Sequence, residues 1–324
     1  MDVNASLRFS VVVPVWGQPD GYLRDCLASL LAQDYPADRY ETIVVDDGSS
    51  EAVRRQVAAF PVPEGRTLVY LAIPRQGPAV ARNAGLALAR GELVAFTDAD
   101  CRAEAGWLAA FDRAIGRGAD TLGGLTVSHS LETFVERYAD HFGSLRTPIS
   151  DARGIVAVIS ANACWRREAL RRLGGFNAAY ERWARRGFFV KGYEDVELCL
   201  RAARAGCQLR FVPGAIVAHR HRKTVAGRLR QFESYGAGYA VLQRLCPEAP
   251  KLSRYHLDHP SRVVQLAGHA LAELLRLPGR PFLYDSKTPI PARVAYPAID
   301  YLQRLAFYAG FRRASRRLLR MDRE

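Results

Sequence analysis

The feature that most constrains the fold is a regular alternation of short apolar segments and helix-like segments in the first hundred residues. The apolar segments are typical of buried strands, and they cover residues 10–13, 42–45, 67–73 and 92–97. Apolar residues at helical spacing lie at 22–32 and 79–90. This order predicts an α/β fold with a mainly parallel sheet covered on both faces, in which ligands bind beyond the carboxyl ends of the strands.

The alternation becomes less regular after residue 120. We predict strands at 121–127, 155–160 and 208–212, and helices at 131–142, 166–173 and 194–205. The last 78 residues contain 8 of the 17 prolines, which predicts short helices and turns in a C-terminal appendage. We therefore expect one domain over residues 1–222, with halves at 1–125 and 126–222, and an extension over 223–324.

The charge of the chain is unevenly distributed. Residues 1–125 hold 12 arginines and 16 acidic residues, a balance of −4, whereas residues 126–324 hold 34 basic and 17 acidic residues, a balance of +17. Such asymmetry is typical of proteins that bind nucleic acid, the anionic inner face of a membrane or a phosphorylated substrate. A solvated basic surface explains it as well. Because no helix-turn-helix, zinc or aromatic RNA-binding signature accompanies the charge, we expect no nucleic-acid partner.

The cysteine pattern and the absence of long apolar segments indicate in which cellular compartment the protein is expected. The six cysteines form no CxxC pair, which is typical of reduced, structural thiols. No window approaches the 18 uninterrupted apolar residues of a spanning helix, and the first residues lack the basic region of a secretory signal. We expect a cytoplasmic protein.

Acidic residues follow two of the predicted strands. Asp46 and Asp47 follow the strand at 42–45, and Asp98 and Asp100 follow the strand at 92–97. A carboxylate at a strand end can accept hydrogen bonds from a nucleobase or ribose, and two carboxylates spaced i, i+2 can hold a hard divalent cation. Taken alone, each pair is also typical of a polar turn after a strand.

Four segments carry a family resemblance together, and they are FSVVVPV at 9–15, VDDGS at 45–49, ARNAG at 81–85 and FTDAD at 96–100. In order, spacing and strand context they resemble the family 2 glycosyltransferases. The resemblance continues through WRREAL at 165–170, GGF at 174–176, YEDVEL at 193–198, Arg201 and His219, and it covers about two thirds of the chain. It implies a GT-A fold with a Rossmann-like nucleotide-sugar-binding half at 1–125, an acceptor and catalytic half at 126–222, and a helical, basic extension.

The resemblance also implies the donor site and its cofactor. Asp47 would accept from the base of a nucleotide-diphospho-sugar, with a UDP-sugar favoured. Asp98 would hold the ribose or the outer shell of a metal, and Asp100 would ligate Mg²⁺ or Mn²⁺, which helps the diphosphate to leave. The full set of implied donor-binding residues is Pro14, Val15, Asp46, Asp47, Arg82, Asn83, Asp98, Ala99 and Asp100.

Catalysis is implied by the acidic pair Glu194 and Asp195. Asp195 matches the family's catalytic base, which takes the proton of the acceptor hydroxyl during an inverting attack on the anomeric carbon. Acidic residues at a helix N-terminus are also favoured by the helix dipole alone. His219 matches a residue that contacts metal or phosphate, and its neighbour His221 is the alternative.

Departures from the family pattern narrow the expected activity. The QxxRW motif of processive, membrane-spanning relatives is absent, so we expect transfer of a single sugar to a carbohydrate or lipid-linked acceptor. The arginine-rich loop at 180–189 is either an acceptor-side lid, with Trp183 and the following Tyr193 facing a sugar, or a packed loop. A retaining transferase or a sugar-nucleotide pyrophosphorylase is the competing enzyme class, although a pyrophosphorylase would carry a glycine-rich basic loop after the first strand.

The C-terminal tail combines arginines with apolar side chains. Residues 301–324 hold seven arginines and two acidic residues, interleaved with leucine, phenylalanine and tyrosine. This pattern is typical of a peripheral helix on an anionic membrane, here the inner face of the cell membrane. A helix packed on the domain with a solvated basic face has the same pattern.

Overall fold

The computed structural model describes residues 7–17, 21–49, 51–116, 118–142, 148–151, 154–177, 179–180, 192–247 and 290–321. Its contacts divide the chain into two compact units, the first formed by residues 1–129 and 145–220 and the second by residues 130–144 and 221–324. The division at residue 220 lies close to the domain boundary expected at 222. The segment 130–144, which we expected in the first domain, groups instead with the C-terminal helices.

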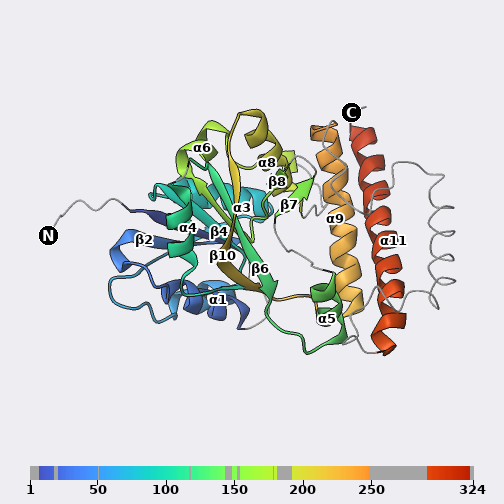
Figure 1. Cartoon of the computed structure of the whole chain (residues 1–324), viewed down its shortest axis with the longest axis horizontal. Coiled ribbons are helices and arrows are strands. Elements are labelled where there is room, and N and C mark those ends of the chain that lie inside the picture. Colours follow the sequence, from blue (N-terminus) through green and yellow to red (C-terminus); the bar gives the residue numbers. More distant parts are fainter. Residues whose placement is uncertain are drawn as a thin grey trace. The chain divides into compact units, whose positions relative to one another are not determined.

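The first unit is built on an eight-stranded sheet with the strand order β3-β2-β1-β4-β9-β6-β10-β5 (Figure 1). The strands are β1 (Phe9–Val15), β2 (Tyr40–Asp47), β3 (Thr67–Ile73), β4 (Leu93–Thr97), β5 (Cys101–Ala103), β6 (Thr121–Ser128), β9 (Asn162–Arg166) and β10 (Leu209–His219). The pairs β1–β2, β2–β3, β1–β4 and β6–β10 are parallel, whereas β9 runs antiparallel to both β4 and β6, and β5 runs antiparallel to β10. The mainly parallel α/β sheet predicted from the sequence is confirmed.

Helices cover both faces of this sheet, which explains why the central strands β1 and β4 are almost entirely apolar and buried. Val11 and Val13 of β1 pack in one core with Leu27 of α1 (Tyr22–Leu31). On the opposite face, Val12 lies against α3 (Pro78–Leu88), where a Cβ at Gly85 would stand only 2.4 Å from Val12 Cγ1. The absence of a side chain at Gly85 therefore lets α3 approach the sheet closely.

The other elements of this unit are the helices α2 (Glu51–Ala58), α4 (Trp107–Ile115), α6 (Arg167–Arg172) and α8 (Glu194–Arg204), the 3₁₀ turn at Ala37–Arg39, and the small hairpin of β7 (Ile149–Asp151) and β8 (Gly154–Ala157). Sequence patterns did not predict α2, α4, β5 or β9. The strand predicted to end before Pro213 instead continues to His219, with an irregularity between Val212 and Ile216 that accommodates the proline.

The second unit contains α5 (Phe134–His141), α9 (Val225–Leu245) and α11 (Ile290–Met321). The prediction of short helices is wrong for residues 290–321, because they form one helix of 32 residues that continues through Pro297. The remaining proline-rich segment, 248–289, lies outside the described residues. No helix in the described part of the chain combines the length and the apolar content needed to cross a bilayer.

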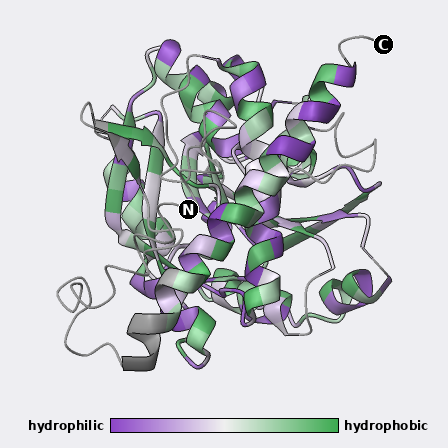
Figure 2. Cartoon of the chain, turned by 90° about the vertical axis from the view of Figure 1, so that its right-hand side faces the viewer, coloured by the Kyte–Doolittle hydropathy of each residue, from purple (hydrophilic) through white to green (hydrophobic). Residues whose placement is uncertain are grey.

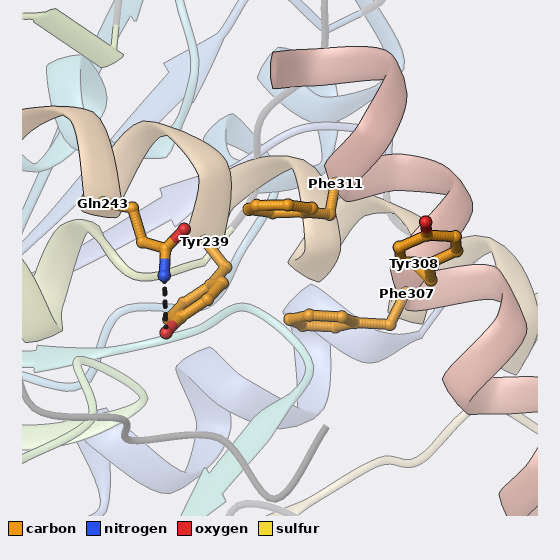
Figure 3. A pocket seen from close by; sticks show the side chains of 5 residues that line it. All are labelled: Tyr239, Gln243, Phe307, Tyr308 and Phe311. Carbon is orange, nitrogen blue, oxygen red and sulfur yellow. Dashed lines mark hydrogen bonds between the residues drawn. The ribbon is translucent and has the colours of Figure 1, made fainter. Parts of the chain in front are cut away.

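The helices α9 and α11 pack closely enough for their backbones to touch. A Cβ at Gly236 would lie 1.8 Å from the carbonyl oxygen of Phe307, and a Cβ at Gly310 would lie 1.8 Å from that of Glu233. Figure 3 shows the aromatic side chains beside this contact, where the rings of Tyr239 and Phe307 are 5.9 Å apart. The absence of side chains at Gly236 and Gly310 therefore lets α9 and α11 pack closely.

Candidate active site

The carboxyl ends of three parallel strands place the first acidic residues at one edge of the sheet. β1 lies between β2 and β4, and Val15 at the end of β1 is paired with Asp46 in β2. Asp98 follows β4 at the same edge. Pro14 belongs to β1, and Ala99, between the two aspartates, is fully buried. The topology therefore gathers residues that are distant in the sequence, such as Asp46 and Asp98, which are 52 positions apart.

The first acidic pair is tied to the loops that follow β2 and β3. Asp46 accepts hydrogen bonds from the Ser49 amide at 2.8 Å and from the Tyr70 hydroxyl at 2.7 Å. Asp47 accepts from the amides of Gln76 at 2.6 Å and Gly77 at 2.8 Å. Burial raises the pKa of Asp47 above its ordinary value. Asp47 therefore orders the loop before α3, and its remaining lone pairs are the ones available to a ligand.

A cation–π pair next to Asp47 was not anticipated from the sequence. The guanidinium carbon of Arg75 lies 3.7 Å from the centre of the Trp16 ring, and Trp16 is 39% exposed just after β1. Gly48 permits this approach, since a Cβ there would stand 2.7 Å from the Arg75 amide nitrogen. The sequence did offer one signal, because Trp16 follows β1 directly and Arg75 lies two residues after β3, and both strands end at this edge.

Arg82 connects Asp98, which follows β4, to Glu194 at the start of α8. Its guanidinium donates to Asp98 Oδ1 at 2.9 Å and to Glu194 Oε1 at 2.7 Å, and the arginine is 4% exposed. Burial by itself lowers the pKa of Arg82, but the charges of Asp98, Glu194 and Asp195 raise it overall, so the guanidinium stays charged. Two residues 96 positions apart, Asp98 and Glu194, are thus held by one side chain.

Asn83, beside Arg82 on α3, uses its amide on the backbone of a turn. It donates to the carbonyl of Phe176 at 2.8 Å and accepts from the amide of Phe176 at 2.8 Å. These bonds hold the turn of residues 174–177 against α3. Donor binding by Asn83 stays a prediction.

Asp195 lies in the first turn of α8, and its pKa is raised above that of an ordinary aspartate. Its carboxylate accepts from the amides of Ser160 at 3.1 Å and Val196 at 2.8 Å. Burial, and then the neighbouring charge of Glu194, raise the pKa of Asp195 to about 7. A group with this pKa can accept and release a proton near neutral pH.

The backbone just before this pair is strained. Tyr193 has φ of 72°, and among the described residues it is the one non-glycine residue with a positive φ. Its carbonyl accepts from the hydroxyl of Tyr180 at 3.2 Å. Such conformations are kept mainly where they position a functional group, and here the strain sets the start of α8 and therefore the direction of Glu194 and Asp195. Trp183, the other expected acceptor-side residue, lies outside the described residues.

Asp100 and His219 form a buried pair at the end of β10. His219 Nε2 lies 3.6 Å from Asp100 Oδ1, and the amide of Arg220 donates to the carbonyl of Asp100 at 3.0 Å. Cys101 completes a group whose potential ligand atoms lie within 4.8 Å of one another. Burial raises the pKa of Cys101 well above its ordinary value, so it remains a thiol. His221 belongs to the second unit and is also buried.

The donor atoms of this group fit a divalent cation. A carboxylate suits Mg²⁺ and Mn²⁺, and the imidazole shifts the preference from Mg²⁺ toward a transition metal such as Mn²⁺. Asp98, which was also expected near the metal, is paired with Arg82.

Comparisons with known proteins show which family the chain resembles. The family described as glycosyl transferase family 2 matches residues 10–174, and glycosyl transferase family group 2 matches residues 94–309. Glycosyltransferase AglE of Haloferax volcanii is 29% identical over 222 residues, which are 67% of this chain and 68% of AglE. Pre-mycofactocin glycosyltransferase of Mycobacterium tuberculosis is 32% identical over 72% of this chain, and the match spans 47% of that longer protein.

Two solved structures share the fold. Mannosyltransferase PcManGT of Pyrobaculum calidifontis, in complex with GDP-Man and Mn²⁺, has a TM-score of 0.61 at 24% identity, with 94% of this chain and 86% of that chain covered. TarS residues 1–349 of Staphylococcus aureus, in complex with UDP-GlcNAc, has a TM-score of 0.54 at 16% identity, with 97% and 92% covered. The model of glycosyl transferase family 2 matches more than half of the sequence, at residues 10–174. Together with the relatives, this match shows that the chain belongs to glycosyl transferase family 2 and is a glycosyltransferase that uses a nucleotide-sugar donor.

Proposed function

We propose that the protein transfers a single sugar from a nucleotide-diphospho-sugar to an acceptor hydroxyl, with inversion and with a divalent metal, in glycan, polysaccharide or glycolipid biosynthesis. The observation that carries this proposal is the Arg82 bridge, since it links Asp98 at the edge where β4 ends to Glu194 beside Asp195. A donor site and a proton acceptor are thereby held together.

Donor recognition would involve the loops after β1, β2 and β3. Asp47 can accept from a nucleobase with its remaining lone pairs, and the exposed face of Trp16 offers a stacking surface beside it. We favour a UDP-sugar. The two solved relatives contain GDP-Man and UDP-GlcNAc, so the base has to be determined for this chain.

A metal would be held by Asp100 and His219, whose buried oxygen and nitrogen atoms lie close together. When bound, Mn²⁺ or Mg²⁺ would offset the negative charge of the departing diphosphate. The Mn²⁺ in the complex of PcManGT supports this role.

Asp195 would act as the general base. The proton of the acceptor hydroxyl moves to the Asp195 carboxylate while the hydroxyl oxygen bonds to the anomeric carbon, and the bond from that carbon to the diphosphate breaks. Attack from the face opposite the diphosphate inverts the configuration. The pKa of Asp195, raised by burial and by Glu194, suits a base that works near neutral pH. Glu194, which is ion-paired with Arg82, is the positioning partner.

The acceptor would be a carbohydrate or a lipid-linked sugar that contacts Tyr193, and Trp183, which lies outside the described residues, remains the other acceptor-side residue proposed from the sequence. We also propose that the protein works in the cytoplasm, with peripheral contact to the inner face of the membrane.

The test is a turnover assay that needs no knowledge of the acceptor. The wild-type protein is incubated with UDP-, GDP-, dTDP- and CDP-sugars and Mn²⁺, and the nucleoside diphosphate released by slow transfer to water is measured. One donor class should be consumed, and Asp195→Asn should slow its consumption on the order of 10²–10⁴-fold. Proton NMR of the anomeric coupling gives the stereochemistry. Retained configuration would contradict inversion, and equal turnover by Asp195→Asn would remove Asp195 as the base.

A further inference from the structure

We infer that the outer face of helix α11 binds the surface of an anionic lipid bilayer. This face, called the arginine face below, comprises the exposed residues Leu302, Ala309, Arg312, Arg313, Arg316, Arg317, Leu319 and Arg320. The inference does not depend on the reaction proposed above.

The arginine face is continuous and lies opposite the packed side of the helix. Arg312, Arg316 and Arg320 repeat every four residues, so they lie on one side of the helix over about 12 Å. Ala309 and the five arginines line one shallow hollow. The opposite side, with Phe307, Ala314 and Leu318, is buried. Figure 2 shows the corresponding hydrophilic bands toward the C-terminal end of α11.

The charge on this face exceeds what the helix itself explains. Residues 305–321 contain five arginines and no acidic residue, and Arg313 pairs with Glu233 of α9. Arg312, Arg316 and Arg320 are exposed along the same face. The helix dipole favours basic residues in the last turn, but Arg312 and Arg313 lie two turns before the end at Met321. A face that presents several exposed arginines and no acidic residue attracts a surface of negative charge.

Two exposed leucines decide in favour of a bilayer over other polyanions. Leu319 is 63% exposed next to Arg316 and Arg320, and Leu302 is 40% exposed two turns before Ala309 on the same face. A nucleic acid or a charged polymer offers phosphates but no apolar layer for these side chains. A bilayer offers both, because leucine enters the acyl region while the long arginine side chains reach the headgroups.

The experiment is vesicle sedimentation of the full chain. Wild-type protein should bind vesicles of phosphatidylcholine with 30% phosphatidylglycerol at low salt, bind pure phosphatidylcholine little, and be released as salt rises toward about 1 M. Each arginine near an anionic surface contributes about fivefold to binding, so the triple variant Arg312→Gln, Arg316→Gln, Arg320→Gln should bind on the order of 100-fold more weakly. Leu319→Gln should weaken binding without changing the charge.

A matched control removes three exposed arginines of the first unit, with Arg54→Gln, Arg55→Gln and Arg210→Gln. It has the same net charge as the triple variant and should bind vesicles like the wild type. Circular dichroism checks that α11 remains folded, and Leu319→Gln stands in if the triple variant unfolds. Equal loss in the control would mean that net charge, not this face, drives binding. Wild-type binding to polyphosphate but not to anionic vesicles would overturn the inference.

Truncation after Asp300 is a poorer test than substitution. It would remove Phe307 and Leu318, which are buried, together with Gln303, which accepts from Arg228 and donates to Tyr138. The loss of packing and the loss of the arginine face would then be confounded.

Discussion

At the scale of the residue, Arg82 is the side chain on which the candidate site most depends. Its planar fork satisfies Asp98 and Glu194 at once, and the compact ammonium of lysine cannot reproduce that geometry. Without the guanidinium of Arg82, the negative charges of Asp98 and Glu194 would no longer both be balanced by a positive charge. We expect the start of α8 to shift as a result.

We therefore expect Arg82→Lys to lower transfer about 10- to 100-fold, the value of one hydrogen bond to a charged group. Initial rates of nucleoside diphosphate release measure the effect. Arg90→Lys is the matched control, because Arg90 also forks onto a buried glutamate, Glu41, but near the amino end of β2. If both variants lose activity equally, the Arg82 effect is one of general stability.

The pH dependence follows from Asp195. A base must be ionised, and burial together with Glu194 raises the pKa of Asp195 to about 7, so kcat/KM should rise with pH and level off above about pH 7. The measurement is a pH–rate profile between about pH 5 and 9. A carboxylate at the ordinary pKa of 3.8 would give a flat profile over this range, and a flat profile would contradict the assignment.

The same shift predicts a trend in stability. The folded protein disfavours the ionised Asp195, so the free energy of unfolding should fall as pH rises from the unfolded pKa, 3.8, to the raised folded value. Asp195→Asn should make that fall shallower. Urea unfolding of both proteins at about pH 5 and 8 measures the difference, and identical pH trends would show that Asp195 is not the titrating group.

At the scale of the element, the packing of α9 against α11 depends on two glycines. A Cβ at Gly236 or Gly310 would meet a carbonyl oxygen of the facing helix at 1.8 Å, a distance that only movement of the helices can relieve. We expect Gly236→Ala and Gly310→Ala each to lower the free energy of unfolding by about 1–3 kcal/mol or more. Thermal unfolding followed by circular dichroism measures this.

Gly116 provides the control for this pair. It follows α4 with φ of −63°, and a Cβ there would meet nothing within 4 Å. Gly116→Ala should therefore leave stability unchanged or raise it slightly. An equal loss in all three variants would show that close helix contact is not what Gly236 and Gly310 provide.

The elements that the sequence predicts well are those whose pattern is local. β1, β4, α3 and α8 were predicted within about two residues, because strand-like apolar runs or helical spacing cover their whole length. β9 was missed because its five residues include Asn162, whose side chain bonds to Leu125 and Ala215 across neighbouring strands. Such a residue looks like a loop residue until its partners are known.

Some features of the candidate site could likewise be predicted from local sequence, and others could not. The aspartates at strand ends can be read from the sequence because each follows its own strand directly. The Arg82 fork and the Trp16–Arg75 pair join residues that are distant along the chain, so only the fold brings them together. The length of α11 was mispredicted because Pro297 is locally unfavourable inside a helix, whereas in the fold the neighbouring Tyr296 and Ile299 pack against Tyr138 and the later part of the helix packs against α9.

At the scale of the whole molecule, two parts of the chain have different charges and different proposed roles. The first 125 residues are acidic overall and supply Asp47, Asp98 and Asp100, whereas the basic surplus lies later and includes the arginine face. The triple arginine variant should therefore bind nucleoside diphosphate with Mn²⁺ as well as the wild type does. Loss of both vesicle binding and nucleotide binding in that variant would contradict this separation.

The most direct test of the central claim is a thermal-shift screen of UDP, GDP, dTDP and CDP, with and without Mn²⁺, on the wild type, Asp100→Ala and Asp195→Asn. If Asp100 and His219 hold a metal beside a nucleotide, one nucleoside diphosphate should raise the Tm of the wild type only when Mn²⁺ is present. Asp100→Ala should lose that shift and Asp195→Asn should keep it. An equal shift in Asp100→Ala, or no shift with any nucleotide, would contradict the account.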